Sequence, residues 1–325
     1  MYASVQALLA HIVDYAGTFP PASLPLDTSV RNFGKYLQEP QAWLLGRLIC
    51  PADRLSDIVP LVQEITLPDR TIALSILGRG GKNETEFFDN VDKDTADMLV
   101  FAGALPGLVR LEGYEVRVPA PFFDPPEAPP LHAALATLSA TLDKTGLPLA
   151  PFVEASAPHR AALQTLITAL QQDRASLEAA ARKTTRPCGL KLRTGGLEPA
   201  AFPGAELVAA ILAGCRKTQV PFKATAGLHH PIRRFDKTVQ AKVHGFINVF
   251  VAACLSHAHD LPVVDLQSAL EEEDAGAFVL DDGGITWRGH RLSNEQIAKA
   301  RTMFISFGSC SFDEPRDDLR TLRWL

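Results

Sequence analysis

The sequence is poor in the features that mark disulfide-stapled, zinc-stabilised or membrane-spanning proteins. Its 325 residues include five cysteines, an odd number, and none of them forms a CxxC pair. A disulfide framework and a structural zinc site are therefore not expected. The longest apolar stretch, GFINVFVAACL, is well short of the roughly 20 residues of a membrane span. The first residues lack the basic segment of a signal peptide, so we expect reduced thiols and a cytoplasmic protein.

Strong charge and nucleotide-binding motifs are also missing. Lysine and arginine number 32 against 37 acidic residues, a formal net charge of −5. Without a basic excess, nucleic-acid binding is not expected. No GxGxxG follows the first expected strand, and GRGGKNE at residues 78–84 lacks the GxxxxGK[ST] spacing, so it is interpreted as a turn. HExxH is absent too, and neither a metal nor another cofactor is expected.

What the chain does contain is a regular alternation of short apolar runs and longer helical patterns. After a first helix at about residues 2–11, eight apolar runs are typical of buried parallel strands. Eight alternations without a second pattern favour an α/β fold, a single (β/α)₈ barrel over residues 1–325, with an open doubly wound sheet as the alternative. The expected strands are residues 11–17, 42–51, 71–78, 108–119, 150–156, 189–196, 220–230 and 303–312.

Residues 261–300 interrupt this alternation before the last strand. They include an acidic helical segment, VDLQSALEEED, and a sequence with Asp-Gly between apolar residues, AFVLDDGGITWRGHRL. Asp-Gly flanked in this way is a strong hairpin signal. We therefore expect an inserted helix and hairpin beside the barrel.

Two lysines occupy the expected sixth and seventh strands. Lys191 and Arg193 are two residues apart in GLKLRTGG, so they point to the same side of a strand, and Lys223 lies in VPFKATAG. Neighbouring strands are about 4.8 Å apart, which would place the two lysines side by side at the barrel mouth. A nearby cation lowers the pKa of a lysine and yields the neutral amine that Schiff-base chemistry needs. Alternatively, both lysines stay charged and grip an anion.

Carboxylates and histidines at other strand ends supply candidates for proton transfer. Asp14 and Glu154 each precede small residues at an expected strand end and are the preferred acid or base, although helix capping or ion pairing is an alternative. Glu112 and Glu115 on the fourth strand are further acidic candidates. Histidines follow the seventh strand and could act near neutral pH, or hold a metal together with Asp14 and Glu154.

The end of the eighth strand, SFGSCSF, combines small residues with a following helix. Backbone N–H groups in such a turn suit phosphate, although a tight turn that only permits packing is the alternative. The residues expected to bind substrate around the mouth are Arg193, Thr194, Gly195, His229, His230, Gly308, Ser309 and Ser311.

Three of these segments resemble class I deoxyribose-phosphate aldolases: KLRTGG, FKATAG and FGSCS. The resemblance implies that Lys191 forms the Schiff base, that Lys223 tunes it, and that residues 308–311 bind phosphate. The chain departs from the family pattern at Arg193, where the family has a small residue. It departs again in the Leu-His-His sequence after the second lysine and in the large insertion before the last strand.

Three functional hypotheses follow from the sequence. The first is a lyase of the class I aldolase type that acts on a small phosphorylated or carboxylated carbonyl compound. The second is a barrel enzyme in which Lys191, Arg193 and Lys223 bind an anion while histidine or a metal does the chemistry. The third is a non-catalytic anion-binding barrel. A membrane partner is not expected, and a homo-oligomer is left open.

Overall fold

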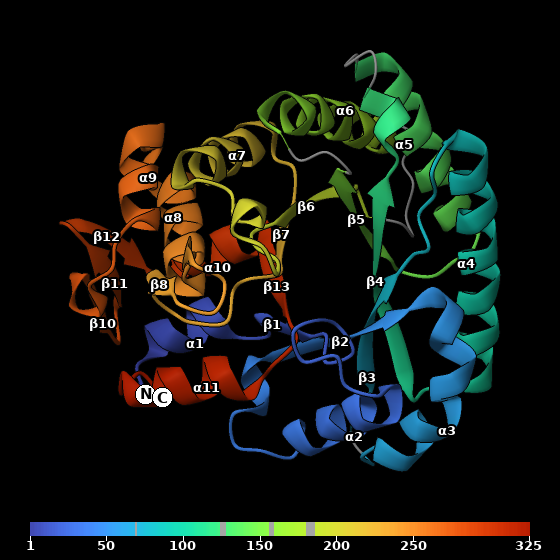
Figure 1. The fold of residues 1–325 in the computed structure, drawn as a ribbon, viewed down its shortest axis with the longest axis horizontal. Helices are drawn as coiled ribbons and strands as arrows, with labels where there is room; N and C mark the ends of the chain where they lie inside the picture. Colours follow the sequence, from blue (N-terminus) through green and yellow to red (C-terminus); the bar gives the residue numbers. More distant parts are fainter. Residues whose placement is uncertain (69, 124–127, 156–158, 180–185) are drawn as a thin grey trace.

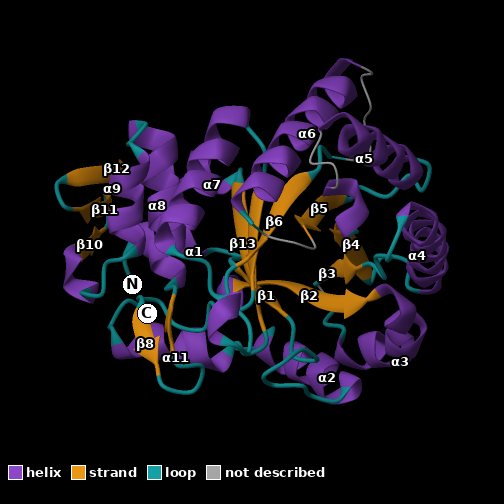
Figure 2. Ribbon diagram, turned by 45° about the horizontal axis from the view of Figure 1, so that its top comes forward, coloured by secondary structure: helices purple, strands orange, loops and turns teal. Residues whose placement is uncertain are grey.

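Eight parallel strands close into a barrel in the computed structural model, which describes residues 1–68, 70–123, 128–155, 159–179 and 186–325 (Figures 1 and 2). Consecutive strands are neighbours around the barrel, and the last strand closes it against the first. The predicted barrel is confirmed, and the open sheet is wrong. The strands are β1 (Val13–Tyr15), β2 (Leu45–Pro51), β3 (Ile72–Leu77), β4 (Val109–Val118), β5 (Ala150–Ala155), β6 (Gly189–Arg193), β7 (Phe222–Thr225) and β13 (Phe304–Ser309).

Helices surround the barrel and bury its outer face (Figure 2). Helix α8 is buried along most of its length, because the inserted segment covers the side that would otherwise face solvent. A helix that is apolar all round needs such a two-sided cover. These helices are α1 (Ala3–Leu9), α2 (Leu26–Tyr36), α3 (Leu55–Ile65), α4 (Glu84–Ala104), α5 (Ala128–Asp143), α6 (Arg160–Ala179), α7 (Ala205–Thr218), α8 (Phe246–His259) and α11 (Asp313–Thr321).

The segment before β13 is more elaborate than the sequence indicated. The expected helix is α9 (Val263–Leu270), and the expected hairpin is formed by β10 (Phe278–Asp281) and β11 (Gly284–Trp287). Arg288 and Gly289 both have positive φ and turn the chain again, so β12 (His290–Ser293) extends the hairpin to three strands. Ser293 then caps an unpredicted helix, α10 (Asn294–Arg301).

A second hairpin, which the sequence did not predict, follows β7. It consists of β8 (Arg234–Asp236) and β9 (Ala241–Val243), which pair antiparallel. These strands have only three residues each, too short for the alternation that predicts strands from sequence.

The inserted segment shares the core of the barrel. Its buried side chains Phe278, Ile285, Trp287 and Leu292 belong to the same hydrophobic cluster as the barrel strands and α8. All five cysteines are buried free thiols. Within the described ranges, no helix is both long and apolar enough to cross a bilayer.

Candidate active site

Lys191 and Lys223 are direct neighbours in the register of β6 and β7, as the strand positions predict. The two side chains share one carboxylate, that of Glu115 on β4. Lys223 Nζ donates to Glu115 Oε1 at 2.5 Å, and Lys191 Nζ lies 2.9 Å from Glu115 Oε2. The lysines therefore sit at one height in the barrel, joined through a residue between them.

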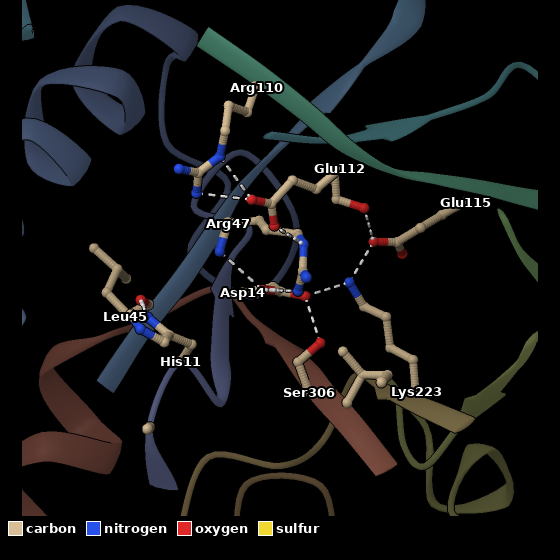
Figure 3. Close-up of polar contacts among 12 residues, drawn as sticks. His11, Asp14, Leu45, Arg47, Arg110, Glu112, Glu115, Lys223 and Ser306 are labelled. Carbon is tan, nitrogen blue, oxygen red and sulfur yellow. Dashed lines mark hydrogen bonds and ion pairs between the residues drawn. The ribbon is translucent and has the colours of Figure 1, made fainter. Parts of the chain in front are cut away.

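Lys223 is enclosed between two carboxylates (Figure 3). Its ammonium donates to Asp14 Oδ2 at 2.5 Å as well as to Glu115, and the side chain is almost fully buried. Burial alone would lower the pKa of Lys223, but Asp14 and Glu115 outweigh it and raise the pKa above its ordinary value. The expectation that a neighbouring cation lowers the pKa of this lysine is therefore wrong, because two carboxylates from other strands contact its ammonium group.

Lys191 is held differently. Its ammonium lies 2.9 Å from Glu115 Oε2 and 3.4 Å from Glu154 Oε2. Glu115 Oε2 accepts no hydrogen bond from the residues that the structure describes, so its contact with Lys191 is purely ionic. Lys191 also lines the main cavity of the barrel, whereas Lys223 is not among the lining residues.

The three carboxylates around the lysines are held in their ionised form. Burial alone would raise the pKa of Glu115, but Lys191 and Lys223 bring it far below its usual range. The pKa of Asp14 is likewise lowered, against the effect of burial, by Lys223 and Arg47. Glu154 follows the same rule, with Lys191 as its strongest neighbouring charge. Paired charges thus offset the cost of burial in this interior.

Every strand of the barrel contributes at least one side chain to this polar network. Ser306 donates to Asp14 Oδ2 and Ser75 donates to Glu115 Oε1, each at 2.6 Å. Arg47 contacts Asp14 Oδ1 at 3.5 Å and continues the chain of charges toward Glu112 at the opposite end (Figure 3). One member from each strand, in the order β1 to β7 and then β13, is Asp14, Arg47, Ser75, Glu115, Glu154, Lys191, Lys223 and Ser306.

Glu115 is the functional residue that the sequence interpretation undervalued. Glu112 and Glu115 are three residues apart, which in a regular strand places them on opposite faces. The pairing of β3 with β4 shifts between Leu74 and Ser75, so both glutamates join the interior chain of charges. A glutamate in a strand covered on both faces was itself a signal, by the same reasoning that selected Lys191.

A cavity of about 660 Å³ opens at the carboxyl ends of the strands. This is the end at which barrel enzymes hold their active sites. The proline-rich loop after β1 lines it with Phe19, Pro20 and Pro21. Residues 78–81, from the glycine-rich segment interpreted as a turn, line it between β3 and α4.

Of the predicted binding residues on β6, only Arg193 lines the cavity. Its Nε donates to Glu154 Oε1 at 3.1 Å. The Thr194 hydroxyl instead donates to Ala226 O at 2.6 Å and ties the β6 and β7 loops together. A Cβ on Gly195 would lie 2.7 Å from the Cα of Gly227, so the glycine permits these loops to approach each other.

The two predicted histidines both face α11. His229 Nδ1 lies 2.8 Å from Glu314 Oε2, and His230 Nδ1 lies 2.6 Å from Asp318 Oδ2. Of the two, His229 lines the cavity. Because its Nδ1 bonds Glu314, the other ring nitrogen is the one available for proton transfer.

In the turn after β13, the eighth strand of the barrel, the serine hydroxyl groups bond within the turn and to α11. Ser309 Oγ donates to Ser311 O at 2.7 Å, and Glu314 N donates to Ser311 Oγ at 3.2 Å. Gly308 lines the cavity. The first turn of α11 carries Asp313 and Glu314, and negative charge at a helix N-terminus takes the place that a phosphate would need.

In the described parts of the chain, no three or more His, Cys, Asp or Glu side chains gather closely enough to hold a metal ion. A scan against protein-family models and a search of curated proteins each return no match. The case for a function therefore depends on the geometry of the network and its cavity.

Proposed function

We propose that the protein is a Schiff-base lyase of the class I aldolase type, with Lys191 as the nucleophile. The observation that carries this proposal is the difference between the two lysines. Lys191 lines the cavity, whereas Lys223 is not a lining residue and is enclosed between Asp14 and Glu115. A substrate carbonyl that enters the cavity can reach the first amine and not the second.

The chemistry follows from the groups that line the cavity. Lys191, after losing its proton to cavity water, attacks the carbonyl carbon, and loss of water gives a cationic iminium. In the cleavage direction, the substrate hydroxyl β to this carbon gives its proton to a base, and the C–C electron pair moves into the iminium. An aldehyde leaves, the enamine is protonated on carbon, and water then releases the second product and restores the amine.

His229 is the proposed base, because it lines the same cavity and Glu314 fixes its ring. Glu115 and Glu154 have a different task. Their lowered pKa values make them poor bases, but their charges stabilise the iminium, which stays cationic at the nitrogen.

A second candidate function is anion binding by charged lysines without Schiff-base formation. It is favoured by one observation: both lysines contact carboxylates, and the pKa of Lys223 is raised. In this case the barrel would bind anions electrostatically and never form a covalent adduct.

Borohydride trapping separates the two candidates. The protein is incubated with small aldehydes, ketones and sugar phosphates, reduced, and analysed by intact mass and peptide mapping. We expect an irreversible adduct on Lys191 that is lost in Lys191→Arg, which keeps the positive charge. An adduct on Lys223 would reverse the assignment of the lysines. No adduct from any carbonyl compound would favour the anion-binding alternative.

A further inference from the structure

We propose that the substrate carries a carboxylate close to its carbonyl group, and that Arg117 and Arg193 bind this carboxylate beside Glu154. The inference rests on the proposed function, because it assigns the substrate class to the same cavity. It differs from the sequence expectation, which put an anion at the turn after the eighth strand.

The two arginines converge on one carboxylate oxygen. Arg117 Nη2 donates to Glu154 Oε1 at 2.9 Å, and Arg193 Nε donates to the same atom at 3.1 Å. Both side chains line the cavity and are more than a third exposed. In the described part of the chain, neither has a second carboxylate partner, so each keeps N–H groups for a ligand.

The charges around Glu154 leave an excess of positive charge at this wall. Lys191 is the third cation in contact with Glu154, and it shares its other partner, Glu115, with Lys223. Arg47 also contacts Asp14, but it is paired with Glu112 at the other end of the network. Among the described residues, the mouth side of the network therefore contains four cations and three carboxylates, namely Lys223, Lys191, Arg117 and Arg193 against Asp14, Glu115 and Glu154.

An excess of one positive charge matches a carboxylate better than a phosphate, which carries about −1.5 to −2 at neutral pH. Two guanidinium groups also offer the paired N–H geometry that a planar carboxylate accepts. The turn after β13 offers the opposite electrostatics, because Asp313 and Glu314 begin the helix that follows it.

The position of Glu154 limits the distance between the carboxylate and the carbonyl. Glu154 contacts the arginines through Oε1 at 2.9 and 3.1 Å and Lys191 through Oε2 at 3.4 Å, so one carboxylate group and its contacts on both sides separate the arginine site from the amine. A substrate joined to Lys191 reaches the arginines with a carboxylate one or two carbons from its carbonyl. This is the structure of a short oxo acid, and the remaining cavity can hold the aldehyde partner.

The test compares carbonyl compounds that differ in the anionic group. Borohydride trapping on Lys191 is measured with acetone, pyruvate, hydroxyacetone and dihydroxyacetone phosphate, and the pyruvate-to-acetone ratio is the readout. We expect Arg117→Gln and Arg193→Gln each to lower this ratio on the order of tenfold, the loss of a charge-assisted hydrogen bond. The matched control is Arg54→Gln, whose exposed partner is Asp57, away from this cavity.

The outcomes distinguish this inference from the proposed function. Adducts with an unchanged ratio in both variants would overturn the carboxylate site and leave the Schiff base standing. The carboxylate class would be overturned if the arginines favour a phosphate instead. In that case the ratio of trapping with dihydroxyacetone phosphate to trapping with hydroxyacetone exceeds the pyruvate-to-acetone ratio and falls in the arginine variants. If no carbonyl compound is trapped, calorimetric titration with lactate, a carboxylate without a carbonyl, decides: weaker binding by Arg193→Gln supports the site, and equal binding overturns it.

Discussion

The β6 side and the β7 side of the barrel place the same residue type at the same height and use it differently. Lys191 and Lys223 share Glu115, yet the second carboxylate of Lys223 is the buried Asp14, whereas that of Lys191 is Glu154 at the cavity wall. The two lysines therefore differ in their access to the cavity and in the carboxylate that completes their ion pairs. A lysine on a barrel strand is therefore not sufficient to identify the nucleophile.

The largest expected effect is on stability. Lys223→Met removes the cation next to Asp14, which is fully buried and does not line the cavity, and breaking a buried ion pair in this way costs about 3–5 kcal/mol. Lys191→Met should cost less than half as much, because cavity water can solvate Glu115 and Glu154. Urea unfolding of both variants measures the two free energies.

Equal losses in the two variants would contradict the proposed difference between the lysines. The pair of variants is its own control, since both exchange the same side chain on neighbouring strands at the same register position. Circular dichroism of the folded proteins establishes that both keep the barrel before the free energies are compared.

The second prediction concerns pH. Glu115, Asp14 and Glu154 have lowered pKa values, so the stability that they contribute is complete above their ordinary values of 3.8 to 4.5 and is lost as pH falls below them. The raised pKa of Lys223 acts in the opposite direction: its contribution is complete below 10.5 and is lost as pH rises through the higher folded value.

Burial lowers the pKa of His244 to about 4, so protonation of the unfolded chain costs stability below pH 6.5. Burial also raises the pKa of Cys50 from 9.0 to about 12, so ionisation of the unfolded thiol costs stability above pH 9. The midpoint of thermal unfolding should therefore form a plateau from about pH 6.5 to 9.

Glu115→Gln tests the source of the acid limb. The amide cannot titrate, so the fall in stability below pH 4.5 should become shallower than in the unmodified protein. A curve of unchanged steepness would assign the acid sensitivity to carboxylates elsewhere, such as Asp281, whose pKa is lowered to about 2 by Arg291.

The sequence predicted the barrel well, because each βα unit has a strong local signal. Each of the eight expected strand ranges contains one strand of the barrel, and β6 and β7 place their lysines in register. The short strands β8 and β9 and the helix α10 escaped prediction, since three-residue strands and an eight-residue helix contain too little periodicity.

The site was predictable in its residues and not in its partnerships. Asp14, Glu154, Lys191 and Lys223 do join one network, but the way in which Glu115 bridges the two lysines, and the register shift in β4 that brings in Glu112 as well, cannot be derived from a local pattern. The pKa direction of Lys223 could not be derived either, because it depends on carboxylates from strands far apart in the sequence. Long-range pairing decides which charges meet, and the residue spacing within one strand contains no information about it.

The smallest expected effect is that of two serine variants, one on each side of the network, on the free energy of unfolding. Ser75→Ala removes a hydrogen bond to Glu115, and Ser306→Ala removes one to Asp14, each from a 2.6 Å contact. Each should cost about 1–3 kcal/mol, as expected for hydrogen bonds to ionised groups.

The two serine variants should differ in borohydride trapping on Lys191 even if they lose the same stability. Ser75 acts through Glu115, which touches Lys191, so Ser75→Ala should shift the pH dependence of adduct formation with pyruvate. Ser306 acts through Asp14 and Lys223, one step further from the reacting amine, so its variant should retain the pH profile of the unmodified protein. Equal shifts in both variants would mean that the network responds as one unit and that Lys223 influences the reaction as strongly as Glu115 does.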